Sequence, residues 1–372
     1  MKSVTLSLLQ SAANAFDFGG PVLCDAHHYG EGHINDTFVV WREDHSKRFI
    51  LQRINTDTFT NPVGLMENVC GVTRHLRAKI LAEGGDPARE TLNVIPTLSG
   101  STCYLDADGG AWRAYDFVED TICLQQVGSE ADFCTVAETL GKFQNQLADY
   151  PASTLHETIA RFHDTPNRYA NFEKALAADA LGRAKNIAPE IEFIHAREKD
   201  CHVLLDQLAA GEIPLRVTHN DTKINNVLFQ PNGNQAIVVI DLDTVMPGLV
   251  GHDFGDAIRF AANYVEEDSP EAEKAGVDME VFRAFTQGFL KHTAATLTQQ
   301  EVDTLALSCF ALTCELATRF LDDYILGSPY FKIQYPEHNL VRARCQIALA
   351  KDMLQKLDEM DAVVHQCMEQ YR

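Results

Sequence analysis

Hydrophobic and polar positions change their spacing along the chain, and this change divides the sequence into two parts. Before residue 120, short apolar runs alternate with turns that contain glycine or charged residues, a pattern typical of antiparallel strands. From Ser129 onward, apolar residues recur at the spacing of one helix face. The pattern predicts an α+β fold with a small β-rich lobe followed by a larger, mostly helical lobe.

The β-rich part is expected to carry two helices among its strands. The first is a short amphipathic helix around Leu6 and Leu9, and the second begins at Asn61-Pro62 and ends before Gly84. The strands expected in this part are residues 22–28, 38–42, 48–55, 93–98 and 111–117.

The helical part is expected to contain several long helices and one β-hairpin. Helical spacing covers residues 133–150, 191–210, 281–293, 301–324 and 339–371. Two β-prone runs, 227–230 and 236–240, flank the turn Pro231-Asn232-Gly233-Asn234. We therefore expect lobes at 1–115 and 121–372 with a hinge at 116–120.

The charge balance limits the possible partners. The chain has 31 Lys and Arg against 53 Asp and Glu, which gives a net charge of −22. Such a surface repels nucleic acid and anionic membranes. A phosphate-bearing ligand would need a few positive groups and bound cations concentrated at one place.

The remaining composition favours a cytoplasmic protein. The ten cysteines are scattered without metal-ligand spacing, as expected of free thiols in a reducing compartment. Polar residues interrupt the apolar positions of the N-terminus, so no signal-peptide core is predicted, and no apolar run is long enough to span a membrane.

The segment THNDTKINNVLF, residues 218–229, carries the strongest chemical signal. Its spacing HxDxxxxN is that of a catalytic loop in which Asp221 accepts the proton of a substrate hydroxyl and Asn226 binds a metal ion. An apolar strand follows and ends in Asp241 and Asp243, whose carboxylates suit Mg²⁺. Each residue alone also fits a turn or strand end, but their joint spacing favours phosphoryl transfer.

The N-terminal lobe offers candidates for nucleotide binding. The loop 29–37 lies between two expected strands, and Gly30 and Gly32 would let its backbone approach phosphates. In the next strand, Arg53 is expected to face the α- and β-phosphates, with Glu67 on the following helix as its partner. A solvated helix-face carboxylate is the alternative for Glu67.

The chain resembles the aminoglycoside phosphotransferase/choline kinase superfamily, which has a two-lobed protein-kinase-like fold. Within it, the sequence is similar to the N-acetylhexosamine 1-kinases, which transfer the γ-phosphate of ATP to the anomeric hydroxyl of N-acetylglucosamine or N-acetylgalactosamine. The resemblance covers nearly the whole chain. The stretches that carry it are YGEGHINDTFVV, FILQRIN, NPVGLMENVCGVTRHL, RFHDTPNRY, THNDTKINNVLF, VIDLDTVMPG, GHDFGDAIRF and ELATRFLDDYILGSPYFK.

This resemblance implies ATP and Mg²⁺ as cofactors and a small sugar as substrate, with Asp221 as the base. It implies three metal ligands: Asn226, Asp241 and Asp243. The residues expected around the nucleotide are Gly30, Gly32, Asn35, Thr37, Arg53, Glu67, Asp116, Phe117, Val118 and Glu119. The residues expected around the sugar are His33, Asp221, Phe260, Arg319 and Tyr330.

Several alternatives stay open from the sequence. Phe260 also fits a core position, and Arg319 could pair with Asp322 or Asp323 on its own helix. A structural turn is the better interpretation of His163-Asp164. A kinase of another alcohol, such as choline, homoserine or an aminoglycoside, and a non-catalytic nucleotide-binding module are the competing functions. Neither the preferred sugar nor the oligomeric state is predicted.

Overall fold

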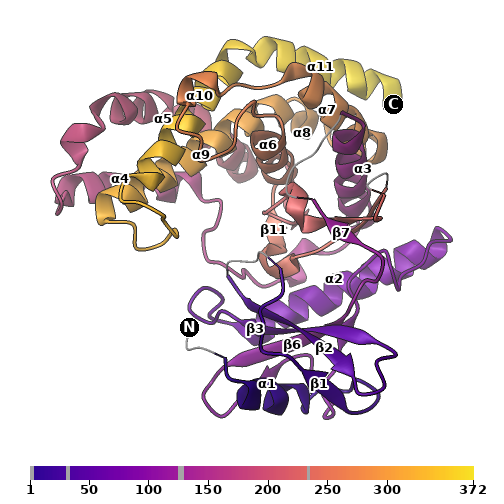
Figure 1. Cartoon of the computed structure of the whole chain (residues 1–372). Coiled ribbons are helices and arrows are strands. Elements are labelled where there is room, and N and C mark those ends of the chain that lie inside the picture. The colour runs from indigo at the N-terminus through magenta and orange to yellow at the C-terminus, as the bar shows by residue number, and fades with distance from the viewer. Residues whose placement is uncertain (1–3, 31–33, 125–129, 233–234) are drawn as a thin grey trace.

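The computed structural model describes residues 4–30, 34–124, 130–232 and 235–372 and has the two-lobed α+β fold expected from the sequence (Figure 1). Its helices are α1 (Leu6–Ala13), α2 (Pro62–Ala82), α3 (Glu130–Gln146), α4 (Thr165–Ala178), α5 (Ala188–Ala210), α6 (Val250–Ala261), α7 (Met279–Thr293), α8 (Gln299–Val302), α9 (Leu305–Leu326), α10 (His338–Gln355) and α11 (Leu357–Tyr371). Its strands are β1 (Val22–Cys24), β2 (Asp36–Arg42), β3 (Arg48–Ile54), β4 (Val94–Ile95), β5 (Tyr104–Leu105), β6 (Ala111–Asp116), β7 (Ile122–Cys123), β8 (Arg216–Thr218), β9 (Val227–Phe229), β10 (Ala236–Val239) and β11 (Met246–Gly248).

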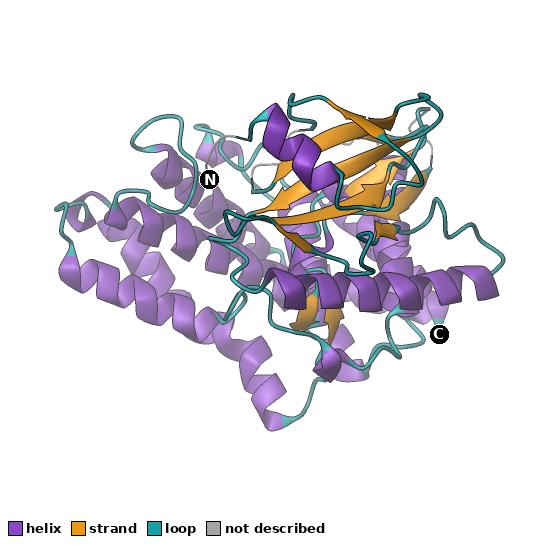
Figure 2. Cartoon of the chain, turned by 90° about the horizontal axis from the view of Figure 1, so that it is seen from below, coloured by secondary structure: helices purple, strands orange, loops and turns teal. Residues whose placement is uncertain are grey.

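The N-terminal lobe is one antiparallel sheet with the strand order β1-β2-β3-β6-β4, and β5 pairs with β6. Helix α1 covers one face, where Leu9 packs with Phe38 and Trp112 in a buried cluster. Figure 2 shows α1 crossing the sheet, with the long helix α2 beside it. Helix α2 packs against part of the other face, where Met66 and Val69 share a buried cluster with Ile54 and Tyr115, and the rest of that face lines the cleft between the lobes.

Strand β3 lies between β2 and β6, and its residues alternate between half-buried and buried from Arg48 to Arg53. Its side chains alternate, as they must in a strand. Leu51 belongs to the cluster beneath α1, whereas Ile50 and Gln52 line the cavity between the lobes. This alternation decides which side chains of the N-terminal lobe can meet a ligand.

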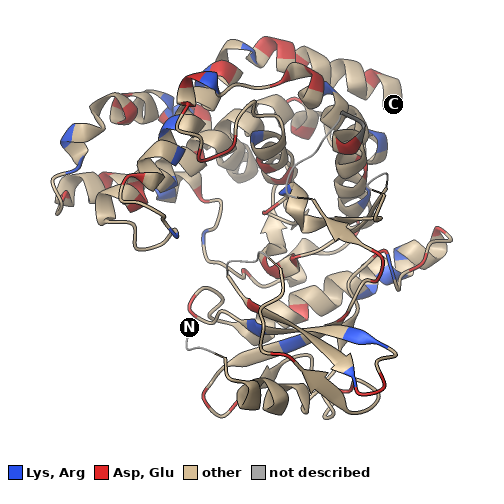
Figure 3. Ribbon diagram, in the orientation of Figure 1, with Lys and Arg blue, Asp and Glu red and all other residues tan. Residues whose placement is uncertain are grey.

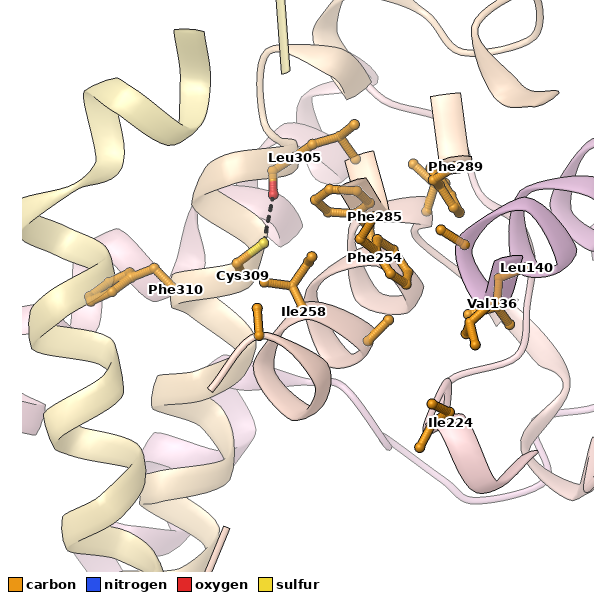
Figure 4. Packing of buried hydrophobic residues seen from close by; sticks show 14 of the residues in the cluster. Val136, Leu140, Ile224, Phe254, Ile258, Phe285, Phe289, Leu305, Cys309 and Phe310 are labelled. Carbon is orange, nitrogen blue, oxygen red and sulfur yellow. Dashed lines mark hydrogen bonds between the residues drawn. The ribbon is translucent and has the colours of Figure 1, made fainter. Parts of the chain in front are cut away.

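The helical lobe is built around α9, which is buried along most of its length. Beside it, Phe254 of α6 packs against Phe285 and Phe289 of α7, with ring centroids 5.7 and 5.4 Å away. Figure 4 shows this aromatic group and the Cys309 thiol, which donates to the Leu305 carbonyl oxygen at 3.4 Å. Burial of these rings fixes the position of α6, and α6 carries side chains that hold the catalytic loop.

Two small antiparallel sheets lie where the lobes meet. Strands β8 and β11 pair with each other, and β9 pairs with both β7 and β10. The segment HxDxxxxN connects β8 to β9, and Asp241 follows β10. The hairpin expected from the sequence is therefore present, although residues 233 and 234 of its turn lie outside the described residues.

Some expected helix boundaries were wrong. The single helix expected over 339–371 is two helices, α10 and α11, which are separated at Lys356. The Lys356 ammonium donates to the Val277 carbonyl oxygen at 3.0 Å and to Asp352 at 2.8 Å, so long-range contacts hold the break. The expected helix 301–324 is likewise divided, since Thr298 and Glu301 form a capping box for the short α8. Helix α4 was not expected.

The surface carries both signs of charge. Figure 3 shows Lys and Arg interspersed with Asp and Glu over both lobes rather than gathered on one of them. None of the helices in the described ranges has the length and apolar character that a membrane span requires. All ten cysteines lie in those ranges, and none is part of a disulfide.

Candidate active site

A cavity of about 560 Å³ lies between the lobes. The N-terminal lobe contributes residues 29–30 and 34–37 and strands β3 and β6 to its wall, and the helical lobe contributes residues 221–226 and the ends of β9 and β10. The volume is within the range of pockets that enclose a small-molecule cofactor. A nucleotide bound between the lobes would contact the residues that line this cavity.

The loop that carries the HxDxxxxN motif, residues 219–226, is held in place by Asp253 of α6. Its carboxylate accepts from the backbone N–H of His219 at 2.9 Å and of Asn220 at 2.7 Å. Asn220 has φ +64°, and its side-chain amide donates to the Thr244 carbonyl oxygen at 2.9 Å, which supports this left-handed conformation. Asp253 lies in the first turn of α6, which begins after its N-cap Leu249. It fixes the backbone that precedes Asp221.

Asp221 lies on the cavity wall and forms an ion pair with Lys223, with 2.9 Å between the carboxylate oxygen and Nζ. Burial acts to raise the pKa of Asp221, but the charge of Lys223 outweighs it and lowers that pKa. Asn226 donates through Nδ2 to the Asp221 carboxylate at 3.2 Å and to its backbone oxygen at 2.8 Å. These contacts favour the carboxylate form of Asp221, which is the form that can accept a proton.

Asp241 lies across the same cavity from the catalytic loop, at the end of β10. Burial, followed by the charges of Asp243 and Asp221, raises its pKa to about 7. Acidic groups crowded in this way are relieved by a divalent cation, for which carboxylate and amide oxygens are suitable ligands. The donor set of Asp241 and Asn226 therefore fits Mg²⁺.

Asp243 was expected to bind the metal ion, but both of its carboxylate oxygens contact other side chains. One of its oxygens forms a buried ion pair with Nη1 of Arg113, and the other accepts from Asn35 Nδ2 at 2.7 Å. Both oxygens face side chains of the N-terminal lobe. Burial opposes the positive charge of Arg113, but Asp243 outweighs this and raises the pKa of the guanidinium. The structure thus favours Asp243 as a link between the lobes rather than as a metal ligand.

The structure contradicts the position expected for Arg53. Its side chain shares a face with Leu51, away from the cavity, and its guanidinium carbon lies 5.9 Å from the ring centroid of Trp112. Gln52 is the β3 side chain that lines this part of the cavity. Successive side chains of a strand point to opposite faces. The sequence analysis assigned Leu51 and Arg53 to the cavity face, whereas Ile50 and Gln52 occupy it.

Glu67 is also not the partner of a cleft cation. It is exposed, and its carboxylate lies 2.6 Å from Nε2 of His156. The preceding residue, Met66, is buried and lies 4.0 Å from Arg113 Nη1. One residue corresponds to about 100° on a helix, which turns Glu67 away from the sheet.

The glycine loop and the hinge are placed largely as expected. Gly30, Asn35 and Thr37 line the cavity. Gly32 and His33 lie outside the described residues, so their positions stay predictions. Of the four hinge residues expected around the nucleotide, three line the cavity, namely Asp116, Phe117 and Val118.

Glu119 is the exception in the hinge. It pairs with Arg48 at 2.7 Å, and the Arg48 guanidinium carbon lies 3.7 Å from the ring centroid of Phe117. Near the hinge, Ile50 and Leu228 contribute apolar walls from opposite lobes. A flat aromatic base would fit between such walls.

Three of the residues expected around a sugar, Phe260, Arg319 and Tyr330, lie in the helical lobe outside the cavity wall. The guanidinium carbon of Arg319 is 5.4 Å from the ring centroid of Phe331 and 5.9 Å from that of Tyr330. Tyr330 is exposed, with 61% of its surface accessible. Phe260 is half-buried against the core, one helical turn after Asp256, which accepts from Thr222 N–H at 3.1 Å. None of these side chains lines the 560 Å³ cavity.

His163 and Asp164 form a structural turn, as the sequence indicated. Asp164 caps α4 by accepting from Asn167 N–H at 3.0 Å. Nδ1 of His163 lies 3.0 Å from the Glu315 carboxylate, and its Nε2 lies 3.4 Å from the Asn220 carbonyl oxygen. The turn therefore connects α9, which carries Arg319, to the catalytic loop.

Among the residues of the cavity wall that the sequence reasoning missed are Lys223, Gln52 and Arg113. Lys223 had a signal, because it stands two residues after Asp221 within the HxDxxxxN motif. Arg113 had none, since it lines the cavity only through the pairing of β6 with β3, which is long-range.

Comparisons with solved structures find the same fold in several kinases and phosphotransferases. An aminopropanol kinase associated with a microcompartment has a TM-score of 0.65 and 18% identity, with 95% of this chain and 98% of that chain covered. For an aminoglycoside phosphotransferase from Alicyclobacillus acidocaldarius, the TM-score is 0.60 at 13% identity, with 97% and 96% covered. For a spectinomycin phosphotransferase in complex with ADP and spectinomycin, it is 0.51 at 15% identity, with 98% and 100% covered.

At these identities the likeness concerns the fold alone. The sequence itself gives the family, because residues 25–287, well over half of the chain, match the profile of one family. The chain belongs to the phosphotransferase enzyme family.

Proposed function

We propose that this protein is an ATP- and Mg²⁺-dependent kinase that phosphorylates the anomeric hydroxyl of N-acetylhexosamines. The observation that carries the proposal is the layout of one cavity. Asp221, Asn226 and Asp241 line one part of it, and the segment 116–118 with its apolar surroundings lines another. A nucleotide with its base at the hinge and its phosphates toward Asp241 fits this layout.

Asp221 acts as the base in this proposal. The sugar hydroxyl oxygen attacks the γ-phosphorus, the bond to the ADP oxygen breaks, and the hydroxyl proton passes to the Asp221 carboxylate. Asp253 keeps the loop in place, and Lys223 lies beside Asp221 with a positive charge available for the transferred phosphoryl group. Positioning and charge stabilisation supply most of the rate in such reactions.

Asn226 and Asp241 would hold Mg²⁺, which supplies charge neutralisation at the phosphates when bound. The raised pKa of Asp241 supports this assignment, since the site is short of positive charge in the absence of a cation. Segment 116–120 serves as the hinge between lobes 1–115 and 121–372. The adenine would be bound by backbone groups of this segment.

A sugar fits the region beyond the catalytic loop better than a cationic alcohol does. Arg319 lies there with the aromatic rings of Tyr330 and Phe331, which offer a donor and apolar faces to a pyranose. Burial, and then the charge of Arg319, lowers the pKa of nearby Arg168. The carboxylates of Glu315 and Asp322 act on Arg168 in the opposite direction, so the preference for a sugar rests on Arg319 and the two aromatic rings.

The test is a kinase assay over a panel of acceptors, with phosphorus NMR of the product. The panel contains N-acetylglucosamine, N-acetylgalactosamine, glucose, choline and an aminoglycoside. Turnover of the N-acetylhexosamines to a 1-phosphate is expected, and Asp221→Asn serves as the inactive control. A 6-phosphate product would overturn the proposal, as would turnover of choline or the aminoglycoside without turnover of the sugars.

A further inference from the structure

The third strand lacks a cation where the phosphates are expected. The β3 side chains on the cavity wall are Ile50 and Gln52, and both are uncharged. Arg53 packs on the opposite face against Trp112. A kinase-type site places a cation from this strand on the α- and β-phosphates. In an acidic protein, the lack of that charge would weaken the binding of ATP.

Arg113 occupies the neighbouring position on β6. It is the register partner of Gln52, and its Nε donates to Gln52 Oε1 at 2.9 Å. The side chain is 2% exposed, yet it forms part of the cavity wall. In the described part of the chain, the cavity wall has two cationic side chains, Arg113 from the N-terminal lobe and Lys223 from the catalytic loop.

The partners of Arg113 leave part of the guanidinium available. Nε is used by Gln52 and Nη1 by Asp243, whereas Nη2 takes no part in these bonds. A buried cation needs a counter-charge, and Asp243 provides it. Asp243 is in turn held by Asn35, which belongs to the loop 29–37. The guanidinium is thereby fixed between the glycine loop and the metal-binding strand end.

We propose that Arg113 is the phosphate-binding cation of the N-terminal lobe, replacing a cation on β3, and that Asp243 orients it. This inference rests on the proposed function, because it requires a nucleotide in the cavity. Arginine suits the role, since its planar fork binds phosphate through two N–H groups. The arrangement also explains why both oxygens of Asp243 point to the N-terminal lobe.

A purely structural role is the competing explanation. The Arg113–Asp243 pair connects the two lobes, so its loss could open the cleft and weaken every ligand. The two roles differ in their effect on adenosine, which has the base and ribose but no phosphates. A phosphate contact leaves adenosine binding unchanged, whereas an opened cleft weakens adenosine and ADP alike.

The experiment is calorimetric titration of ADP and of adenosine, each with and without Mg²⁺, into the full-length protein and its variants. Arg113→Met is expected to weaken ADP binding by about 10- to 100-fold, the range of one or two charge-assisted hydrogen bonds. Adenosine affinity stays within about twofold of the wild type. Arg113→Lys recovers part of the ADP affinity, because the charge is kept.

Arg53→Met is the matched control, since it removes the same guanidinium from the other face of the sheet. It is expected to bind ADP as the wild type does. If Arg113→Met leaves Asp243 unpaired and fails to fold, the double variant Arg113→Met/Asp243→Asn removes both charges together. The same selective loss of ADP binding is expected of it.

Three results would overturn the inference. They are an unchanged ADP affinity in Arg113→Met or the double variant, an equal loss for ADP and adenosine, and a selective loss in Arg53→Met instead. A wild-type protein that binds neither ADP nor ATP would contradict the proposed function itself. The two failures are therefore distinguishable in one titration series.

Discussion

The imidazole Nδ1 of His163 lies 3.0 Å from the buried carboxylate of Glu315. The second oxygen of Glu315 accepts from the Thr165 hydroxyl at 2.9 Å, and His163 Nε2 lies 3.4 Å from the Asn220 carbonyl oxygen. Asn220 directly precedes Asp221. A buried acid of α9 is thus connected through one imidazole to the catalytic loop.

The stability that Glu315 provides is expected to depend on pH. Burial opposes its ionisation, but the charges of His163, Arg319 and His252 outweigh this and lower its pKa from 4.5 to about 2. A lowered acid pKa stabilises the fold above pH 4.5, and the contribution is lost as pH falls toward 2. The shift corresponds to roughly 3 kcal/mol at neutral pH.

Glu315→Gln is therefore expected to lower the free energy of unfolding by about 3 kcal/mol at pH 7 and by about 1 kcal/mol less at pH 3.5. Urea denaturation at several pH values measures the difference. Glu369→Gln, on the exposed face of α11, is the control and changes little. A difference between wild type and Glu315→Gln that is the same at every pH contradicts the prediction.

Asp221→Asn is expected to lower kcat by about 10²- to 10⁴-fold, the usual contribution of a positioned base. ADP affinity changes little, because Asn226 and Asp241 are kept. Steady-state kinetics and ADP titration together measure the two effects. Asp206→Asn, an exposed position on α5, is the surface control. A variant with nearly full activity would remove Asp221 from the role of base.

Local spacing accounts for what the sequence could predict. Asp221 and Asn226 are five residues apart in one loop, and Asp241 ends the next hairpin, so short-range geometry brings all three to one cavity. The start of α2 was equally predictable, because Asn61 caps it and Pro62 occupies its first turn. Such features depend on a few consecutive residues.

The errors came from positions that only long-range packing decides. Both faces of β3 are apolar, so the two-residue period could not tell whether Gln52 or Arg53 faces the cleft. Arg113 reaches the cavity through its register with Gln52, 61 residues away in sequence. The choice between Met66 and Glu67 depends on the rotation of α2 against the sheet.

Removal of Mg²⁺ should reveal which acid binds it. In the wild type, we expect Mg²⁺ to tighten ADP binding and EDTA to abolish turnover. Asp241→Asn is expected to lose the Mg²⁺-dependent increase in ADP affinity while keeping most of the Mg²⁺-free affinity. Asp243→Asn is the matched comparison, because the oxygens of Asp243 already bind Arg113 and Asn35.

Calorimetric titration of ADP with and without Mg²⁺ measures the increase in each variant. The Mg²⁺-dependent increase in ADP affinity should remain in Asp243→Asn, even if the affinity for ADP is lower overall. Loss of the Mg²⁺ effect in Asp243→Asn, with the effect intact in Asp241→Asn, would reverse the assignment of the metal ligand.

Asp323 is expected to control acceptor binding by holding the loop that carries Tyr330. Its buried carboxylate accepts from the backbone N–H of Tyr330 at 2.9 Å and of Phe331 at 3.0 Å, and from Asn339 Nδ2 at 2.8 Å. An amide offers one acceptor oxygen where the carboxylate offers two. Asp323→Asn should therefore release one side of this loop.

The expected result is a KM for the sugar about tenfold higher, the cost of one or two hydrogen bonds to a charged group, with the KM for ATP within about twofold of the wild type. Initial-rate kinetics with each substrate varied in turn measure the two constants. Asp361→Asn on α11 is the control, because its carboxylate lies 3.6 Å from Nε2 of His365 on the same helix. An equal rise in both KM values would indicate a general loss of structure, because a loop that contacts only the acceptor cannot change the affinity for the nucleotide.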